Sequence, residues 1–123
     1  MRHLNILVVD DKKVIGDFFN LTMGYYGHHI TVVHDKDHTL EAVKLNEYDI
    51  AFMDMVMPDQ DGVEVLKEVK AINPQLPVVM MTGYSIEEKR KQAKQLGAVN
   101  CLKKPFEMED IRRVVKEALG EEI

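Results

Sequence analysis

The sequence predicts an α/β fold in which five parallel strands form one doubly wound sheet and five helices cover it. Along its 123 residues, short apolar runs alternate strictly with segments whose apolar residues recur at helical spacing. The apolar runs do not themselves alternate with polar residues, which is typical of parallel strands covered on both faces. We therefore expect residues 1–123 to form one domain with right-handed crossovers and no output domain.

Each expected strand is a short run of apolar, mostly β-branched or otherwise bulky residues. Pro77 is tolerable because it is the first residue of its strand. Five strands are expected, at residues 4–9, 30–33, 49–53, 77–81 and 99–102.

The expected helices begin and end at recognisable residues. Gly27 stands where a left-handed C-terminal cap of the first helix would lie, and Asn73-Pro74 stops the third helix. Ser85 is a candidate N-cap, with Glu88 completing a capping box. The first helix is expected to bury the stripe formed by Val14, Phe18, Leu21 and Tyr25. Five helices are expected, at residues 12–26, 36–46, 63–72, 86–96 and 107–119.

Composition and charge exclude several classes of protein. With 16 Lys and Arg against 21 Asp and Glu, the formal net charge is −5, which disfavours direct nucleic-acid binding. The single cysteine, Cys101, cannot form an internal disulfide. The apolar runs are far shorter than the roughly 20 residues that cross a bilayer, and no signal segment precedes the first strand. We expect a cytoplasmic protein without a membrane partner.

Polar residues follow every expected strand, where open parallel sheets form their binding sites. His34 and Asp35 follow the second strand, and the other four strands are followed by Asp10, Asp11, Asp54, Thr82 and Lys104. Three carboxylates at one edge repel each other without a cation, and a few hard oxygen ligands suit Mg²⁺. A carboxylate beside such a cation can attack a phosphoryl group, while the metal and Lys104 neutralise the transferred oxygens. One such Asp alone is more commonly a helix N-cap, but their joint occurrence favours chemistry.

Over residues 5–119 the chain resembles the response-regulator receiver domain. The resemblance is carried by Asp10-Asp11, by residues 54–62, by Thr82-Gly83 and by Lys104-Pro105-Phe106. It implies a flavodoxin-like (βα)5 receiver fold. It also implies a single-domain response regulator of a two-component or phosphorelay signalling system, of the chemotaxis type or the sporulation-phosphorelay type. Such a protein is a phosphoprotein in signal transduction.

The same resemblance implies the roles of the site residues. Asp54 would accept the phosphoryl group from a phosphohistidine of a histidine kinase or histidine phosphotransferase. Thr82 would hydrogen-bond that group, and Lys104, after a cis Lys104-Pro105 bond, would pair with it. The magnesium ligands would be Asp10, Asp11, Asp54 and the backbone carbonyl of Val56. The protein would not be an enzyme but a phosphoacceptor that assists its own phosphorylation and dephosphorylation.

Other positions are candidates for partner docking and for switching. The family usually carries Tyr or Phe where this chain has Cys101, so signalling would rely on Tyr84 and on the surface of the fourth helix and fifth strand. The first helix carries more apolar residues than one stripe needs, and the family docks its histidine donors there. The expected docking residues are Ile15, Phe18, Pro105 and Phe106. The downstream target is unknown from the sequence.

Two alternatives stay open. An aspartyl-phosphate hydrolase of similar fold needs a second Asp two positions after the first, but Lys12 and Lys13 stand there. An unphosphorylated interaction module is disfavoured because every family site residue is present. The histidines at positions 28, 29, 34 and 38 fit no zinc pattern and are expected to be a solvated cluster.

Overall fold

A computed structural model describes residues 2–58, 60–83 and 87–123. At its centre lies one five-stranded sheet in the order β2-β1-β3-β6-β7, in which every neighbouring pair is parallel. The strands are β1 (Asn5–Val9), β2 (His29–Val33), β3 (Ile50–Asp54), β6 (Val78–Thr82) and β7 (Asn100–Lys103). The doubly wound prediction is confirmed. The chain direction across the sheet reverses between β1 and β3, so their carboxyl ends form the switch point.

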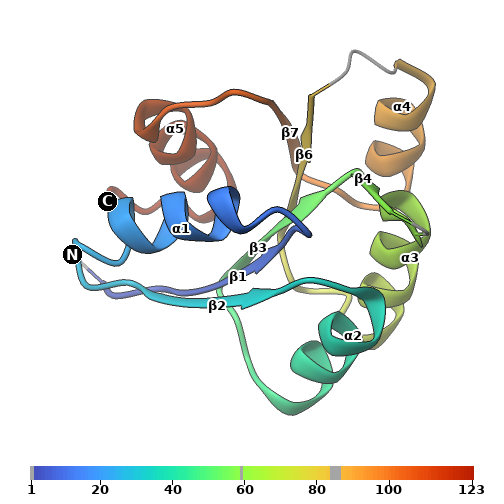
Figure 1. The fold of residues 1–123 in the computed structure, drawn as a ribbon, viewed down its shortest axis with the longest axis horizontal. Coiled ribbons are helices and arrows are strands. Elements are labelled where there is room, and N and C mark those ends of the chain that lie inside the picture. Colours follow the sequence, from blue (N-terminus) through green and yellow to red (C-terminus); the bar gives the residue numbers. More distant parts are fainter. Residues whose placement is uncertain (1, 59, 84–86) are drawn as a thin grey trace.

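The helices cover both faces of this sheet. They are α1 (Lys13–Thr22), α2 (Lys36–Leu45), α3 (Gly62–Ile72), α4 (Glu87–Gln95) and α5 (Met108–Leu119). In Figure 1, α1 and α5 lie on one side of the sheet, and α2, α3 and α4 lie on the other. None of the helices within the described ranges is long and apolar enough to cross a membrane.

The core is divided by the sheet into two layers. In β1, Leu7 and Val9 belong to the layer on the α2–α4 side, whereas Ile6 and Val8 belong to the layer with α1 and α5. Successive strand side chains point to opposite faces, and here both faces are buried. This arrangement explains why the strands read as unbroken apolar runs.

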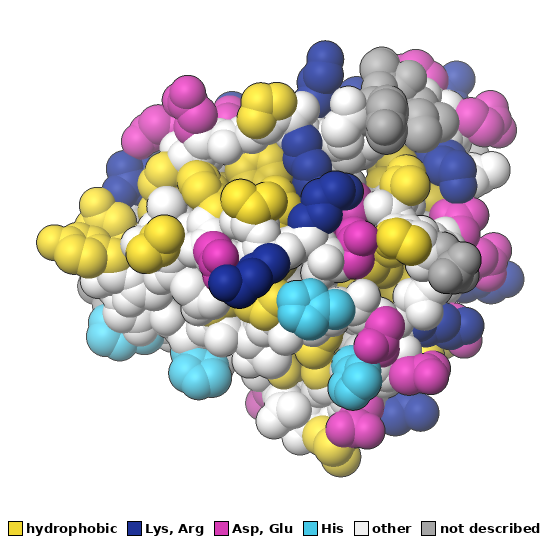
Figure 2. Space-filling model, viewed as in Figure 1, with side chains coloured by type: hydrophobic (Ala, Val, Ile, Leu, Met, Phe, Trp, Pro, Cys, Tyr) yellow, Lys and Arg dark blue, Asp and Glu magenta, His cyan; other side chains and the backbone are white. Residues whose placement is uncertain are grey.

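The predicted buried stripe of α1 is wrong. Val14, Leu21 and Tyr25 are 66%, 77% and 82% exposed, whereas Phe19 and Met23 are fully buried. The segment carries apolar residues on two faces, so helical spacing alone did not identify the face that meets the sheet. Figure 2 shows hydrophobic side chains standing out at the left edge of the molecule, next to the C-terminal end of α1 in Figure 1.

Two further segments differ from the prediction. α1 ends at Thr22 rather than at residue 26, and Gly27, with φ +88°, lies in the turns that follow the helix. Residues 54–61 lie between the expected strand at 49–53 and the expected helix at 63–72, and they contain a small antiparallel pair that the sequence did not predict, β4 (Val56–Met57) and β5 (Gln60–Asp61). The Ser85 N-cap lies outside the described residues.

Candidate functional site

The carboxyl ends of the strands bring the predicted charged residues together. Asp10, Asp11 and Asp54 each offer a carboxylate oxygen, and these oxygens lie within 4.8 Å of one another. The Lys104 Nζ atom lies 2.8 Å from Asp10 Oδ2 and 3.5 Å from Asp54 Oδ1. We call Asp10, Asp11 and Asp54 the acidic cluster. Its three carboxylates outnumber the single ammonium of Lys104, so an excess of negative charge remains.

Asp10 is fully buried and makes hydrogen bonds through both its carboxylate and its backbone. Its exposed fraction is 0%, and its Oδ1 atom accepts a hydrogen bond from the Lys12 backbone N–H at 2.9 Å. Its Oδ2 atom accepts from Lys104 at 2.8 Å, and its own backbone N–H donates to the Val33 carbonyl at 3.1 Å. The bonds from Lys12 and Lys104 restrict the orientation of the Asp10 carboxylate, and the bond to Val33 holds its backbone N–H.

The surroundings of Asp54 disfavour its negative charge. Asp54 ends β3, is 3% exposed, and accepts a 3.3 Å hydrogen bond from the Val56 N–H at Oδ1. Burial, and next the negative charge of Asp10, raise the pKa of the Asp54 carboxyl, while Lys104 opposes the rise. A nearby cation would favour the ionised form of this carboxyl.

Two carboxylate oxygens of the acidic cluster accept no hydrogen bond from the described residues. Among the described residues, Asp11 Oδ1 and Asp54 Oδ2 are buried and have no hydrogen-bond partner. Buried acceptors are normally paired, so two orphan carboxylate oxygens in one cluster fit a bound cation. Hard carboxylate oxygens are the donors that divalent cations such as Mg²⁺ take. The acidic cluster can therefore hold a metal ion.

Thr82 and Lys104 lie at the same edge of the sheet. Thr82 ends β6 and is buried, and its backbone carbonyl accepts a hydrogen bond from the Lys104 N–H at 2.7 Å. The Lys104–Pro105 peptide bond is cis, as predicted. The backbone thus ties the two residues together beside the carboxylates.

The expected docking residues form part of an aromatic cluster. The rings of Phe18 and Phe106 meet edge to face, with centroids 5.7 Å apart, and Phe106 also contacts Phe19. Ile15, Phe18 and Phe106 are half-buried against the α1 and α5 layer, and Pro105 is exposed. The structure brings Phe18 and Phe106 together, and their docking role stays a prediction.

Of the two expected switch residues, Cys101 lies within the described ranges. Cys101 is a free, half-buried cysteine on β7, and burial raises the pKa of its thiol. It lines a groove of about 360 Å³ between α4 and β7, together with Arg90 and Lys94. Tyr84 lies outside the described residues.

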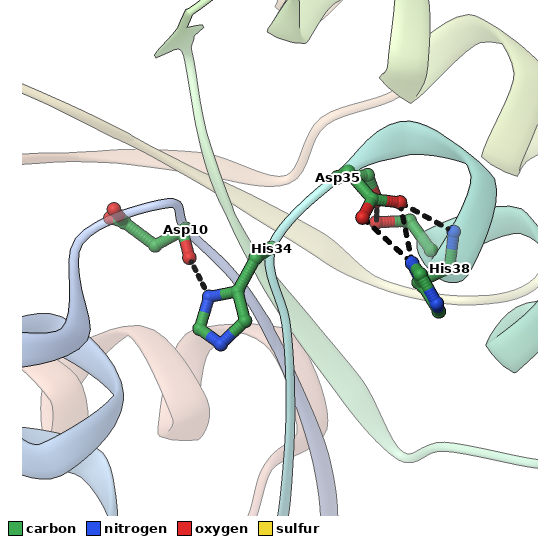
Figure 3. Close-up of polar contacts among 5 residues, drawn as sticks. Asp10, His34, Asp35 and His38 are labelled. Atoms are coloured by element: carbon green, nitrogen blue, oxygen red, sulfur yellow. Dashed lines mark hydrogen bonds and ion pairs between the residues drawn. The ribbon is translucent and has the colours of Figure 1, made fainter.

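The histidines depart in part from the expected solvated cluster. His28 is 5% exposed, and its Nδ1 atom accepts a hydrogen bond from the Leu4 N–H at 3.0 Å. His38 is exposed and bonds to Asp35, the N-cap of α2. His34 contacts the site, since its Nδ1 atom lies 2.8 Å from the Asp10 carbonyl oxygen (Figure 3). Sequence reasoning gave His34 no role, although its place directly after the second strand was a signal.

Comparison with known proteins agrees with this geometry. A model of the response regulator receiver domain matches residues 6–116. Sporulation initiation phosphotransferase F of Bacillus subtilis is 32% identical over 119 residues, which are 97% of this chain and 96% of that protein. The transcriptional regulatory protein ZraR of Escherichia coli is 32% identical over 118 residues, but the chain spans only 27% of its length.

Solved structures give the same result. The receiver domain of NtrX from Brucella abortus is 32% identical, with a TM-score of 0.87 over 94% of this chain and 98% of that one. The chemotaxis response regulator CheY4 of Vibrio cholerae is 26% identical, with a TM-score of 0.86 over 96% of this chain and 100% of that one.

Proposed function

Because the chain belongs to the response regulator receiver domain family, whose members serve two-component and phosphorelay signalling, we propose that it accepts a phosphoryl group on Asp54. The donor is a phosphohistidine of a histidine kinase or a histidine phosphotransferase. One observation carries the proposal: a buried Asp54 with an unpaired oxygen lies among two further carboxylates and Lys104.

Asp54 is the nucleophile in this reaction. One of its carboxylate oxygens attacks the phosphorus atom and forms an acyl phosphate, while the bond from phosphorus to the donor nitrogen breaks and its electron pair stays on the imidazole. Lys104 moves from its carboxylate partners to the incoming phosphoryl oxygens, and Thr82 hydrogen-bonds one of them. Fixed donors of this kind stabilise charge that develops in the transition state.

Mg²⁺ is the cofactor that fits the acidic cluster. Asp10, Asp11, Asp54 and the Val56 carbonyl would hold it, and Asp10 would act mainly through water. When bound, the ion offsets the negative charge on the carboxylates and on the transferred oxygens. The protein is then a phosphoacceptor that assists its own phosphorylation and dephosphorylation rather than an enzyme with a separate substrate.

The partner side of the proposal rests on the apolar residues beside the site. Ile15, Phe18, Pro105 and Phe106 would dock the donor and hold its imidazole in line with Asp54. The phosphorylated protein would pass the group on, or would signal through the surface of α4 and β7, with Cys101 and Tyr84 as the proposed switch residues. Residues 1–123 would act as one receiver domain in the cytoplasm, and comparison with sporulation initiation phosphotransferase F supports the relay role.

Incubation with a radiolabelled small phosphodonor, with and without Mg²⁺, tests the proposal. We expect stoichiometric, Mg²⁺-dependent labelling of the wild type and none of the Asp54→Asn variant. Continuous release of phosphate from phosphomonoesters without a labelled protein would instead indicate the hydrolase. A folded wild type that takes no label would indicate the interaction module.

A further inference from the structure

The backbone carbonyl of Asp10 contacts a side chain at the position where the neighbouring strand of a sheet would normally donate a backbone hydrogen bond. β1 and β2 pair in parallel up to Val9 and Val33, and the Asp10 N–H still donates to the Val33 carbonyl at 3.1 Å. In a continued ladder the Asp10 carbonyl would accept from the backbone N–H of Asp35. Asp35 is instead the N-cap of α2, so the strand has ended.

His34 supplies the missing donor. Its Nδ1 atom lies 2.8 Å from the Asp10 carbonyl oxygen, and because a carbonyl oxygen can only accept, this hydrogen bond requires a ring whose Nδ1 carries a proton. Figure 3 shows the carbonyl directed at the ring while the Asp10 carboxylate points the other way. Among the described residues, no other hydrogen bond to this carbonyl is present.

We propose that His34 is a positioning residue that fixes the Asp10 backbone and thereby preforms the metal site. The Asp10 carboxylate is attached through Cβ to the Cα atom of this backbone, so a movement of the backbone at Asp10 moves its oxygens relative to Asp11 and Asp54. Groups that orient metal ligands typically affect metal affinity by 10- to 100-fold. His34 would affect the metal only through Asp10, and because His34 is exposed, a water molecule can replace its hydrogen bond in a variant. We therefore expect an effect at the low end of that range.

His29 provides a matched control. His29 is an exposed histidine at the opposite end of β2, and only its backbone is in the β1–β2 ladder. His34→Asn is the conservative variant, because an amide nitrogen on Cγ occupies the place of the imidazole Nδ1. The inference rests on the proposed phosphoacceptor function, because the metal site is part of that proposal.

The experiment measures Mg²⁺ affinity by calorimetric titration and the tautomer of His34 by long-range ¹H–¹⁵N NMR. We expect His34→Ala to raise the dissociation constant about 10-fold, with His34→Asn within about 3-fold of wild type and His29→Ala unchanged. We also expect the Nδ1-protonated tautomer in the metal-free protein, and similar thermal unfolding of all variants in chelator.

If the wild type binds Mg²⁺, three results would overturn the inference. These are wild-type affinity in His34→Ala, an equal loss in His34→Ala and His34→Asn, or a His34 ring protonated only at Nε2. A wild type that binds no Mg²⁺ but shows the Nδ1 tautomer would refute the proposed metal site, and with it the role of His34 there. The NMR result thus separates failure of the hydrogen bond from failure of the proposed function.

Discussion

Gly62 is the position at which the smallest added group should disturb the site most. It is the first residue of α3, and its N–H donates to the Met55 carbonyl at 3.1 Å. A Cβ atom there would lie 2.4 Å from the Asp54 carbonyl oxygen and 2.6 Å from that of Met55. Ordinary contacts begin at 3.4 Å, so the Gly62→Ala variant must move α3 or the Asp54 backbone by about 1 Å.

The cost of this movement follows from what is contacted. Overpacking a tight interior costs about 1–3 kcal/mol, and the atoms in the way are backbone rather than a flexible side chain. We therefore expect Gly62→Ala to lower the free energy of unfolding by about 3 kcal/mol, which for a chain of this size lowers the melting temperature by about 10 °C. A displacement of about 1 Å at the nucleophile also slows phosphorylation by about 100-fold.

Urea denaturation followed by far-UV circular dichroism measures the stability term. Gly83→Ala is the matched control, because, its chain neighbours aside, no heavy atom of the described residues lies within 4 Å of the Cβ it would add. That variant should stay within about 0.5 kcal/mol of wild type. A Gly62→Ala variant equally close to wild type would show that the added Cβ atom does not displace α3 or the Asp54 backbone.

Three further predictions concern the metal, the pH dependence and the donor. Asp11→Asn should weaken Mg²⁺ binding by at least about 10-fold in a calorimetric titration, and unchanged affinity would mean that the acidic cluster is not the metal site. Burial, and next the charge of His3, lower the pKa of His28. Between the lowered pKa and the ordinary value, His28 is therefore protonated in the unfolded chain and neutral in the folded chain. The free energy of unfolding should therefore fall as the pH drops from the ordinary histidine value of 6.5 towards the lowered one, and His28→Asn should abolish that slope in urea titrations at several pH values. Ile15→Ala should slow transfer from a phosphorylated histidine protein by roughly 10- to 100-fold and leave phosphorylation by acetyl phosphate nearly unchanged, and equal loss with both donors would contradict the docking surface.

The strands and the sheet type were predictable because each strand is an unbroken apolar run between turn residues. The buried face of α1 was not predictable, because Val14, Leu21 and Tyr25 have the same helical periodicity as the residues that meet the sheet. Only the packing of α1 on β1 and β3 decides that Phe19 is inside, through its contact with the Phe52 ring at 4.9 Å between centroids. The small β4–β5 pair was missed because two-residue strands have no periodicity.

The site was predictable to the extent that strand ends define it. Asp10, Asp54 and Lys104 are far apart in sequence, but parallel strands deliver them to one edge, as the structure shows. The role of His34 was not visible, because a side-chain bond to a backbone carbonyl depends on where β2 stops and α2 begins. The burial of His28 likewise depends on the approach of Leu4, 24 positions away.

The central claim is that Asp54 carries the phosphoryl group. Borohydride reduces an acyl phosphate to an alcohol, so treatment of the phosphorylated protein, digestion and mass spectrometry locate the modified carboxyl. We expect residue 54, and no other aspartate, to be converted to homoserine, and only when Mg²⁺ was present during phosphorylation. Conversion at residue 10 or 11 instead, or phosphate recovered on a histidine, would contradict it.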